Sequence, residues 1–148
     1  ILALMSDLRF ASEDAVLTTV FLKRGLIAEH GSSWLLPRLV GVSNALDLLW
    51  MSDKISATDA ADIGLVDRVV GADALLDTAR DYIRRLSETS APKAIAASKR
   101  LVYDHLGKGY LAALRETELV QNDFVSAPDA TEGAQAFIEK RPANFTGK

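Results

Sequence analysis

The stretch ISATDAADIGLVDRVV, residues 55–70, constrains the fold more than any other part of the chain. Ser56 lies three residues before Asp59, which is the spacing of a capping box at the start of a helix. Gly64 then follows, and glycine readily takes the left-handed conformation that ends a helix. The run LVDRVV is typical of a strand. A short helix that leads directly into a strand predicts a mixed α/β unit.

Two short apolar segments precede this stretch. LRFAS (8–12) and AVLT (15–18) are separated by the polar turn Glu13–Asp14, and they predict two short buried strands. Residues 32–51 carry apolar side chains at helical spacing, and Gly41 divides this expected helix. The first half of the chain is therefore predicted to be α/β.

The pattern changes to helices after Gly71. Apolar residues recur at helical spacing in the next segment: Leu75, Leu76, Ala79, Ile83 and Leu86. A second helix is predicted to end at Gly107, and a third to run from Tyr110 to Val125. Pro128 and Asp129 start a fourth, in which Glu132 stands at capping-box spacing. The second half of the chain is therefore predicted to be entirely helical.

Composition excludes several functional classes. The 148 residues fit one ordinary domain, and the net charge of −3 comes from interspersed charges without a basic block that would favour nucleic acid. Apolar runs are too short to span a bilayer, so no membrane partner is expected. The absence of cysteine excludes disulfides and thiol catalysis, and a cytoplasmic location is expected. No metal site is predicted.

Four motifs in order give the chain a family likeness: SDLRFASEDAVL, KRGLIAEHGSSWLLPRLVG, ISATDAADIGLVDRVV and AFIEKRPANFTGK. Their order and spacing resemble those of the crotonase, or enoyl-CoA hydratase/isomerase, superfamily. The resemblance implies an α/β fold, a spiral of ββα turns, followed by a helical trimerisation region. On this basis residues 1–90 are expected to be the C-terminal part of the α/β core and residues 91–148 the helical region. The N-terminal half of the family fold is expected to be absent.

The resemblance also implies a chemistry. Family members bind a coenzyme A thioester whose carbonyl oxygen lies between two backbone N–H donors, which stabilise negative charge as an enolate forms. Both donors are expected in segments before Ile1. Coenzyme A is part of the substrate, so no separate cofactor is expected. The expected assembly is a homotrimer or a dimer of trimers.

The two glutamates of typical hydratases are replaced in this chain. Their positions match Ile1 and Phe21, and neither side chain can transfer a proton. Hydration needs one group to activate water and another to deliver a proton. The resemblance therefore argues against ordinary hydratase chemistry.

Glu29, in the loop GLIAEHG, is the candidate catalytic residue. Its position matches the single glutamate of peroxisomal Δ3,Δ2-enoyl-CoA isomerases, in which one carboxylate moves a proton from C2 to C4. Partial burial among apolar residues would raise the pKa of such a base. The alternative reading is a surface acid stabilised by the helix dipole. His30 is expected to be a loop residue, and Ser32 and Ser33 are expected to cap the following helix.

Four further residues are candidate substrate contacts. Trp34 and Phe21 are expected to line an acyl pocket, although core packing is the usual role of a tryptophan at helical spacing. The resemblance implies that Phe137 and Lys140 contact the adenine and phosphate of coenzyme A, often across a subunit boundary. The alternative for this pair is an apolar helix face and a solvated charge.

The sequence leaves three functions open. The first is an isomerase-type acyl-CoA enzyme with Glu29 as base. The second is a hydratase, thioester hydrolase or decarboxylase that uses groups outside this chain. The third is a non-catalytic acyl-CoA-binding protein, which the loss of both hydratase acids favours and the presence of Glu29 opposes.

Overall fold

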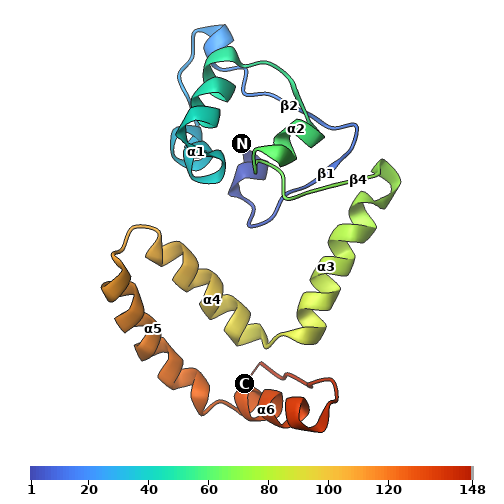
Figure 1. The fold of residues 1–148 in the computed structure, drawn as a ribbon, viewed down its shortest axis with the longest axis vertical. Helices are drawn as coiled ribbons and strands as arrows, with labels where there is room; N and C mark the ends of the chain where they lie inside the picture. The colour runs from blue at the N-terminus through green and yellow to red at the C-terminus, as the bar shows by residue number, and fades with distance from the viewer. Residues whose placement is uncertain (148) are drawn as a thin grey trace. The chain divides into compact units, whose positions relative to one another are not determined.

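The computed structural model describes residues 1–147, which divide into two compact units, Ile1–Arg80 and a second from Asp81 onward. The first unit holds every strand of the described chain (Figure 1). Its elements are η1 (Leu2–Met5), β1 (Phe10–Ser12), β2 (Val16–Leu17), η2 (Leu22–Arg24), α1 (Ser32–Met51), β3 (Ile55–Ser56), α2 (Ala57–Asp62), β4 (Arg68–Val70) and η3 (Ala72–Ala74). Helix α3 (Leu75–Thr89) crosses the boundary between the units. The sequence-based division after residue 90 concerns the family fold and stays a prediction.

The strands form two small sheets. β1 pairs with β4 in parallel, with Phe10 opposite Arg68. β2 pairs with β3 in antiparallel fashion, with Val16 opposite Ser56. Both strands expected before residue 20 are present, but Val16 is exposed, and β3 was not predicted. The expected strand over LVDRVV is shorter than predicted, because its first residues lie in the loop before β4.

Arg9 joins the loops before β1 and β4. Its backbone N–H donates to Asp67 Oδ2 at 2.7 Å, and its Nε donates to the Leu65 carbonyl oxygen at 2.9 Å. The guanidinium also forms an ion pair with Asp67 at 3.1 Å. Because the Arg9 side chain is only 9% exposed, this pair is a partly buried tie between segments far apart in sequence.

Helix α1 supplies most of the core of the first unit. The buried apolar cluster comprises Leu36, Val40, Ala45, Leu48, Leu49, Ala60, Leu65 and Val66. Gly41 interrupts the helix at φ 76° and ψ 165°, which confirms the predicted division. The predicted capping box of α2 is confirmed in part: the Asp59 N–H donates to Ser56 Oγ at 3.1 Å, but the Asp59 carboxylate accepts from the Ser56 hydroxyl and not from a backbone N–H.

The second unit contains the end of α3 followed by α4 (Pro92–His105), α5 (Tyr110–Val125) and α6 (Pro128–Glu139), which confirms the all-helical prediction. Helices α4 and α6 each begin with proline, where a missing N–H costs no helical hydrogen bond. The expected capping role of Glu132 is wrong, because its carboxylate binds Arg141 and the Asn144 N–H instead. No helix within residues 1–147 is both long and apolar enough to cross a membrane.

Candidate functional site

The candidate site is the turn that starts α1. His30 has φ 54° and Gly31 has φ 79°, so two consecutive residues take the left-handed conformation. Gly31 is the N-cap, and its carbonyl accepts the Leu35 N–H at 2.9 Å. The Glu29 carbonyl accepts the Ser32 N–H at 3.0 Å. This backbone arrangement, rather than a side-chain cap, fixes the position of Glu29 at the helix entrance.

Ser32 does not cap the helix, which corrects the sequence-based expectation. Gly31 holds the cap position, and no side chain makes a capping hydrogen bond there. The Ser32 side chain is fully buried, and its Oγ has no hydrogen-bond partner among residues 1–147. The error arises because His30 and Gly31 both take the left-handed conformation. The helix therefore starts one residue earlier than a cap at Ser32 would require.

The Glu29 carboxylate is only partly enclosed. Its side chain is 38% exposed, and Oε2 lies 3.8 Å from His30 Nε2. Within the described part of the chain no hydrogen bond to this carboxylate is found, so both oxygens keep free acceptor capacity. Neighbouring side chains rarely face each other on a helix, but the left-handed turn brings this pair together. A carboxylate so placed can accept a proton from a bound ligand.

Phe21 lies beside this turn. Its carbonyl accepts the N–H groups of Arg24 and Leu26, which folds the η2 segment back on itself. The centroids of the Phe21 and His30 rings are 6.3 Å apart, with the ring planes inclined at 57°. The structure therefore brings Phe21 and the Glu29–His30 pair into one neighbourhood, with an apolar ring at one side.

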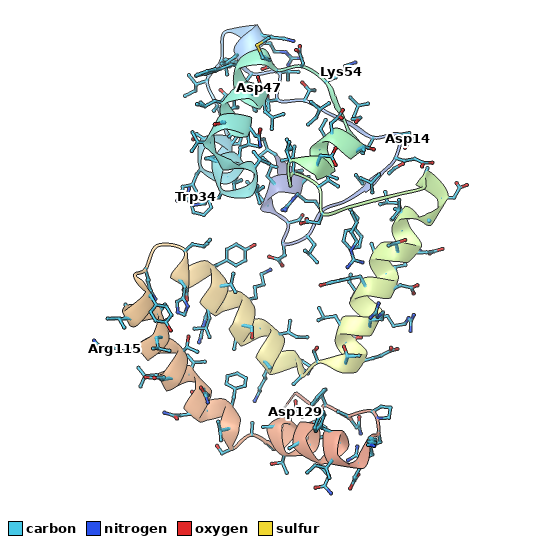
Figure 2. All side chains as sticks on the ribbon, viewed as in Figure 1. Asp14, Trp34, Asp47, Lys54, Arg115 and Asp129 are labelled. Atoms are coloured by element: carbon cyan, nitrogen blue, oxygen red, sulfur yellow. The ribbon has the colours of Figure 1, made fainter. Side chains whose placement is uncertain are left out.

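Trp34 projects from the first turn of α1 (Figure 2). It is 48% exposed, and the guanidinium carbon of Arg38 lies 3.8 Å from its ring centroid, in a cation–π contact. Arg38 Nη1 also donates to the Trp34 carbonyl at 3.0 Å. Trp34 is not part of the buried cluster, so the core-packing alternative is wrong for this residue.

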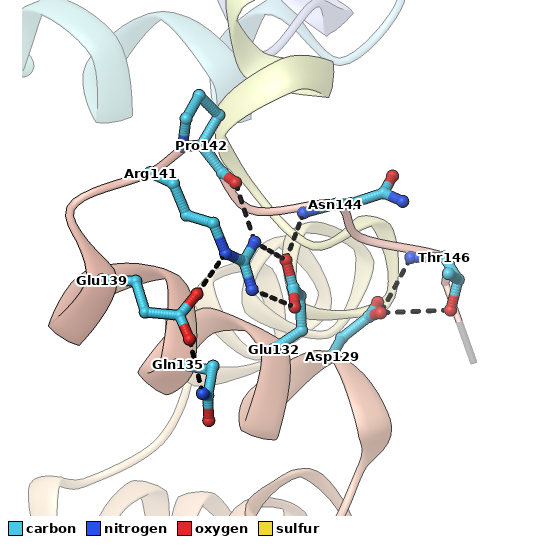
Figure 3. Close-up of polar contacts among 8 residues, drawn as sticks. All are labelled: Asp129, Glu132, Gln135, Glu139, Arg141, Pro142, Asn144 and Thr146. Atoms are coloured by element: carbon cyan, nitrogen blue, oxygen red, sulfur yellow. Dashed lines mark hydrogen bonds and ion pairs between the residues drawn. The ribbon is translucent and has the colours of Figure 1, made fainter.

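Phe137 and Lys140 belong to the second unit, at the C-terminal end of α6. Phe137 is 85% exposed, and Lys140 is also exposed. Lys140 has φ 54° and ends the helix. Sequence reasoning missed the neighbouring Arg141, whose guanidinium binds two carboxylates of α6 (Figure 3). The two acidic residues before Arg141, Glu132 and Glu139, were the available signal for this ion-pair cluster. Charged residues at the end of a helix are, however, usually solvated.

Comparison with solved structures defines the class. The chain superposes on a crystal structure of enoyl-CoA hydratase from Bacillus anthracis with a TM-score of 0.95 and 29% identity, covering 99% of this chain and 57% of that one. The fold is therefore the crotonase α/β fold predicted from the sequence. The family model described as enoyl-CoA hydratase/isomerase matches residues 1–148. The chain belongs to the enoyl-CoA hydratase/isomerase family.

Curated relatives carry different activities in their names. A "Probable enoyl-CoA hydratase" of Rhodobacter capsulatus is 32% identical over 99% of this chain and 57% of its own length. The 1,2-epoxyphenylacetyl-CoA isomerase of Escherichia coli is also 32% identical, over 99% of this chain and 56% of its own length. The chain thus spans a little over half the length of these relatives.

Proposed function

We propose that this chain is part of an enzyme that moves the double bond of a 3-enoyl-CoA thioester to the 2-position, with Glu29 as the base. The observation that carries the proposal is the Glu29 carboxylate, which stands at the entrance of α1 with free acceptor oxygens, next to His30, whose ring lies 6.3 Å from that of Phe21. Family membership supports an acyl-CoA substrate.

One carboxylate is sufficient for this reaction. Glu29 takes a proton from C2, the electrons move into a dienolate, and the same proton returns to C4 as the double bond shifts. General-base catalysis of this kind is typically worth about 10²–10⁴-fold in rate. Two backbone N–H donors would hold the enolate oxygen. The acyl chain, packed on Phe21, would complete the apolar surroundings of the carboxylate.

Trp34, Phe137 and Lys140 have proposed binding roles. The exposed Trp34 face next to the α1 entrance suits contact with the acyl chain. Phe137 and Lys140 offer an exposed aromatic ring and an ammonium group at the end of α6, which suit an adenine and a phosphate.

A homotrimer or a dimer of trimers is the proposed assembly. Several apolar side chains on α4, at its C-cap and on α5 are exposed in the single chain: Val102, Leu106, Leu111, Leu114 and Leu119. When such side chains form a large exposed patch, that patch usually marks a site of protein association. The proposal gives these helices a role that a monomer would not need.

The test replaces Glu29 by Gln in the full-length protein, which keeps the shape of the side chain and removes its basicity. We expect kcat for 3-enoyl-CoA to fall by about 10²–10⁴-fold with little change in KM, because the lost interaction acts in proton transfer. Glu13→Gln is the matched control, since Glu13 is an exposed glutamate in the turn between β1 and β2.

Three results would reject this assignment. If Glu29→Gln isomerises as fast as the wild type, Glu29 is not the base. If the wild type hydrates 2-enoyl-CoA and does not isomerise, the second candidate function holds, which the name of the Rhodobacter capsulatus relative favours. That reaction would need acidic groups at other positions, because Ile1 and Phe21 cannot transfer a proton. If the protein binds acyl-CoA and converts neither substrate, it is a binding protein.

A further inference from the structure

His30 is the ionisable neighbour of the Glu29 carboxylate. Its Nε2 lies 3.8 Å from Glu29 Oε2, which is within ion-pair distance and beyond hydrogen-bond distance. Side chains of adjacent residues point apart on regular helices and strands, and these two meet because His30 takes φ 54°. The left-handed conformation, which is uncommon for histidine, therefore places an imidazole beside the proposed base.

The main chain of this turn is fixed, whereas the Glu29 side chain is not held by it. The Glu29 carbonyl accepts the Ser32 N–H at 3.0 Å, and the Gly31 carbonyl accepts the Leu35 N–H at 2.9 Å. The carboxylate itself is 38% exposed, and the ionisable group beside it is His30. A base for proton transfer must hold one orientation, because a small displacement from the reacting atom costs much of the rate. The carboxylate therefore needs a second side chain to restrain it.

The Phe21 ring supports the imidazole. The centroids of the two rings are 6.3 Å apart with the planes inclined at 57°, which is within the range of tilted aromatic pairs. The Phe21 backbone is anchored in turn, since its carbonyl accepts the N–H groups of Arg24 and Leu26 at 3.0 and 3.1 Å. Phe21, His30 and Glu29 therefore lie in a row, in which each side chain is next to the following one.

We propose that His30 is a positioning residue for Glu29, and that its imidazole, supported by the Phe21 ring, holds the carboxylate in the orientation that proton transfer requires. The inference rests on the proposed function and adds His30 to it. The imidazole Nε2 faces Oε2, so the other carboxylate oxygen stays free for the substrate. Contacts of this kind are often long without substrate and shorten when it binds. His30 itself takes no proton from the substrate.

Two substitutions in the full-length protein separate the imidazole from the backbone. Asparagine accepts the left-handed conformation, but its side chain is too short to replace Nε2. His30→Asn should therefore lower kcat for 3-enoyl-CoA about tenfold, with little change in KM and Tm. Glutamine carries an amide N–H that reaches about as far as Nε2, so His30→Gln should retain more of kcat. If His30→Asn folds poorly, His30→Gly takes its place, because glycine readily adopts a positive φ.

A double-mutant cycle tests whether His30 acts through Glu29. In the Glu29→Gln background, His30→Asn should cause no further loss of kcat, because the group that it positions is no longer a base. Phe21→Leu keeps an apolar side chain and removes the ring, so it should lower kcat less than His30→Asn does. His105→Asn is the matched control and should leave kcat unchanged, since His105 belongs to a different histidine–glutamate pair, with Nε2 3.4 Å from Glu116 Oε2 on α5.

The outcomes distinguish the positioning role from the proposed function. If Glu29→Gln turns over as fast as the wild type, the proposed function fails and the positioning role fails with it. If Glu29→Gln is slow but His30→Asn keeps the wild-type kcat, only the positioning role is wrong. The same fold loss from His30→Asn in the wild-type and Glu29→Gln backgrounds would also overturn it. A fall in Tm that accounts for the lost activity would mean that His30 only stabilises the turn.

Discussion

Two helix ends in this chain carry a charged side chain beside left-handed backbone, and different forces hold them. At the entrance of α1, Glu29 precedes His30 and Gly31, and the following helix is fixed by buried apolar residues such as Leu36. At the exit of α6, Lys140 is followed by Arg141, which is fixed by carboxylates. Apolar burial supports the first helix end, whereas ion pairs support the second.

The largest effect should come from breaking the apolar support of the first helix end. Leu36 is 1% exposed, and Leu36→Ala should lower the free energy of unfolding by about 2–5 kcal/mol, through lost burial and the cavity left behind. Chemical denaturation of the full-length protein measures this loss. Leu36→Met is the control and should cost less than about 1.5 kcal/mol. A loss below about 1 kcal/mol for Leu36→Ala would show that the α1 entrance does not depend on this contact.

A smaller effect should follow from a change in the turn itself. Gly31 has φ 79°, and a Cβ built there meets no atom within 4 Å, so Gly31→Ala has only a conformational cost. That cost should be about 1–2 kcal/mol, the penalty of an L-residue in the left-handed region. Gly107→Ala is the comparison, because Gly107 has equal space without a positive φ. Equal unfolding free energies for the two variants would mean that the turn at Gly31 relaxes.

The smallest effect should be a local change at the second helix end in acid. The pKa of Glu132 lies below its ordinary 4.5, at about 2, so its stabilising contribution is complete above about 4.5. It is lost as the pH falls from there towards about 2. In nuclear magnetic resonance spectra of the folded protein the Asn144 amide, which donates to Glu132, should shift with a midpoint near pH 2, while the Leu35 amide should not follow this titration. An Asn144 midpoint near 4.5 would contradict the strength of the Arg141–Glu132 ion pair.

Residue spacing within the sequence was enough to predict the helices and the N-cap at Ser56. That cap and the division at Gly41 were both predictable, because each depends on residues within one or two turns. The tie between Arg9 and Asp67 was not, since it joins loops almost sixty residues apart. Strand pairing was missed for the same reason, because β1 and β2 each find a partner after α1.

The candidate site was predictable in position and not in geometry. Glu29 was found through the family resemblance, which fixes a place in a loop. The left-handed conformation of His30 could not be read from the sequence, because a histidine seldom adopts it. The role of Glu132 was mispredicted, since it matched a local capping pattern, whereas its carboxylate binds Arg141 after the helix end. A capping hydrogen bond from a four-residue motif is weaker than the two charged hydrogen bonds that the Arg141 guanidinium makes with Glu132.

The break at Gly41 has a consequence for how the apolar residues of α1 are arranged in sequence. At about 100° per residue, the thirteen steps from Leu36 to Leu49 would leave these side chains roughly 220° apart around an unbroken helix. Both are nonetheless buried in the same cluster. The non-helical backbone at Gly41 breaks the helical phase between the two leucines, so that both can be buried in one core. Without such a break, one straight helix would have to bury two widely separated faces in the same core.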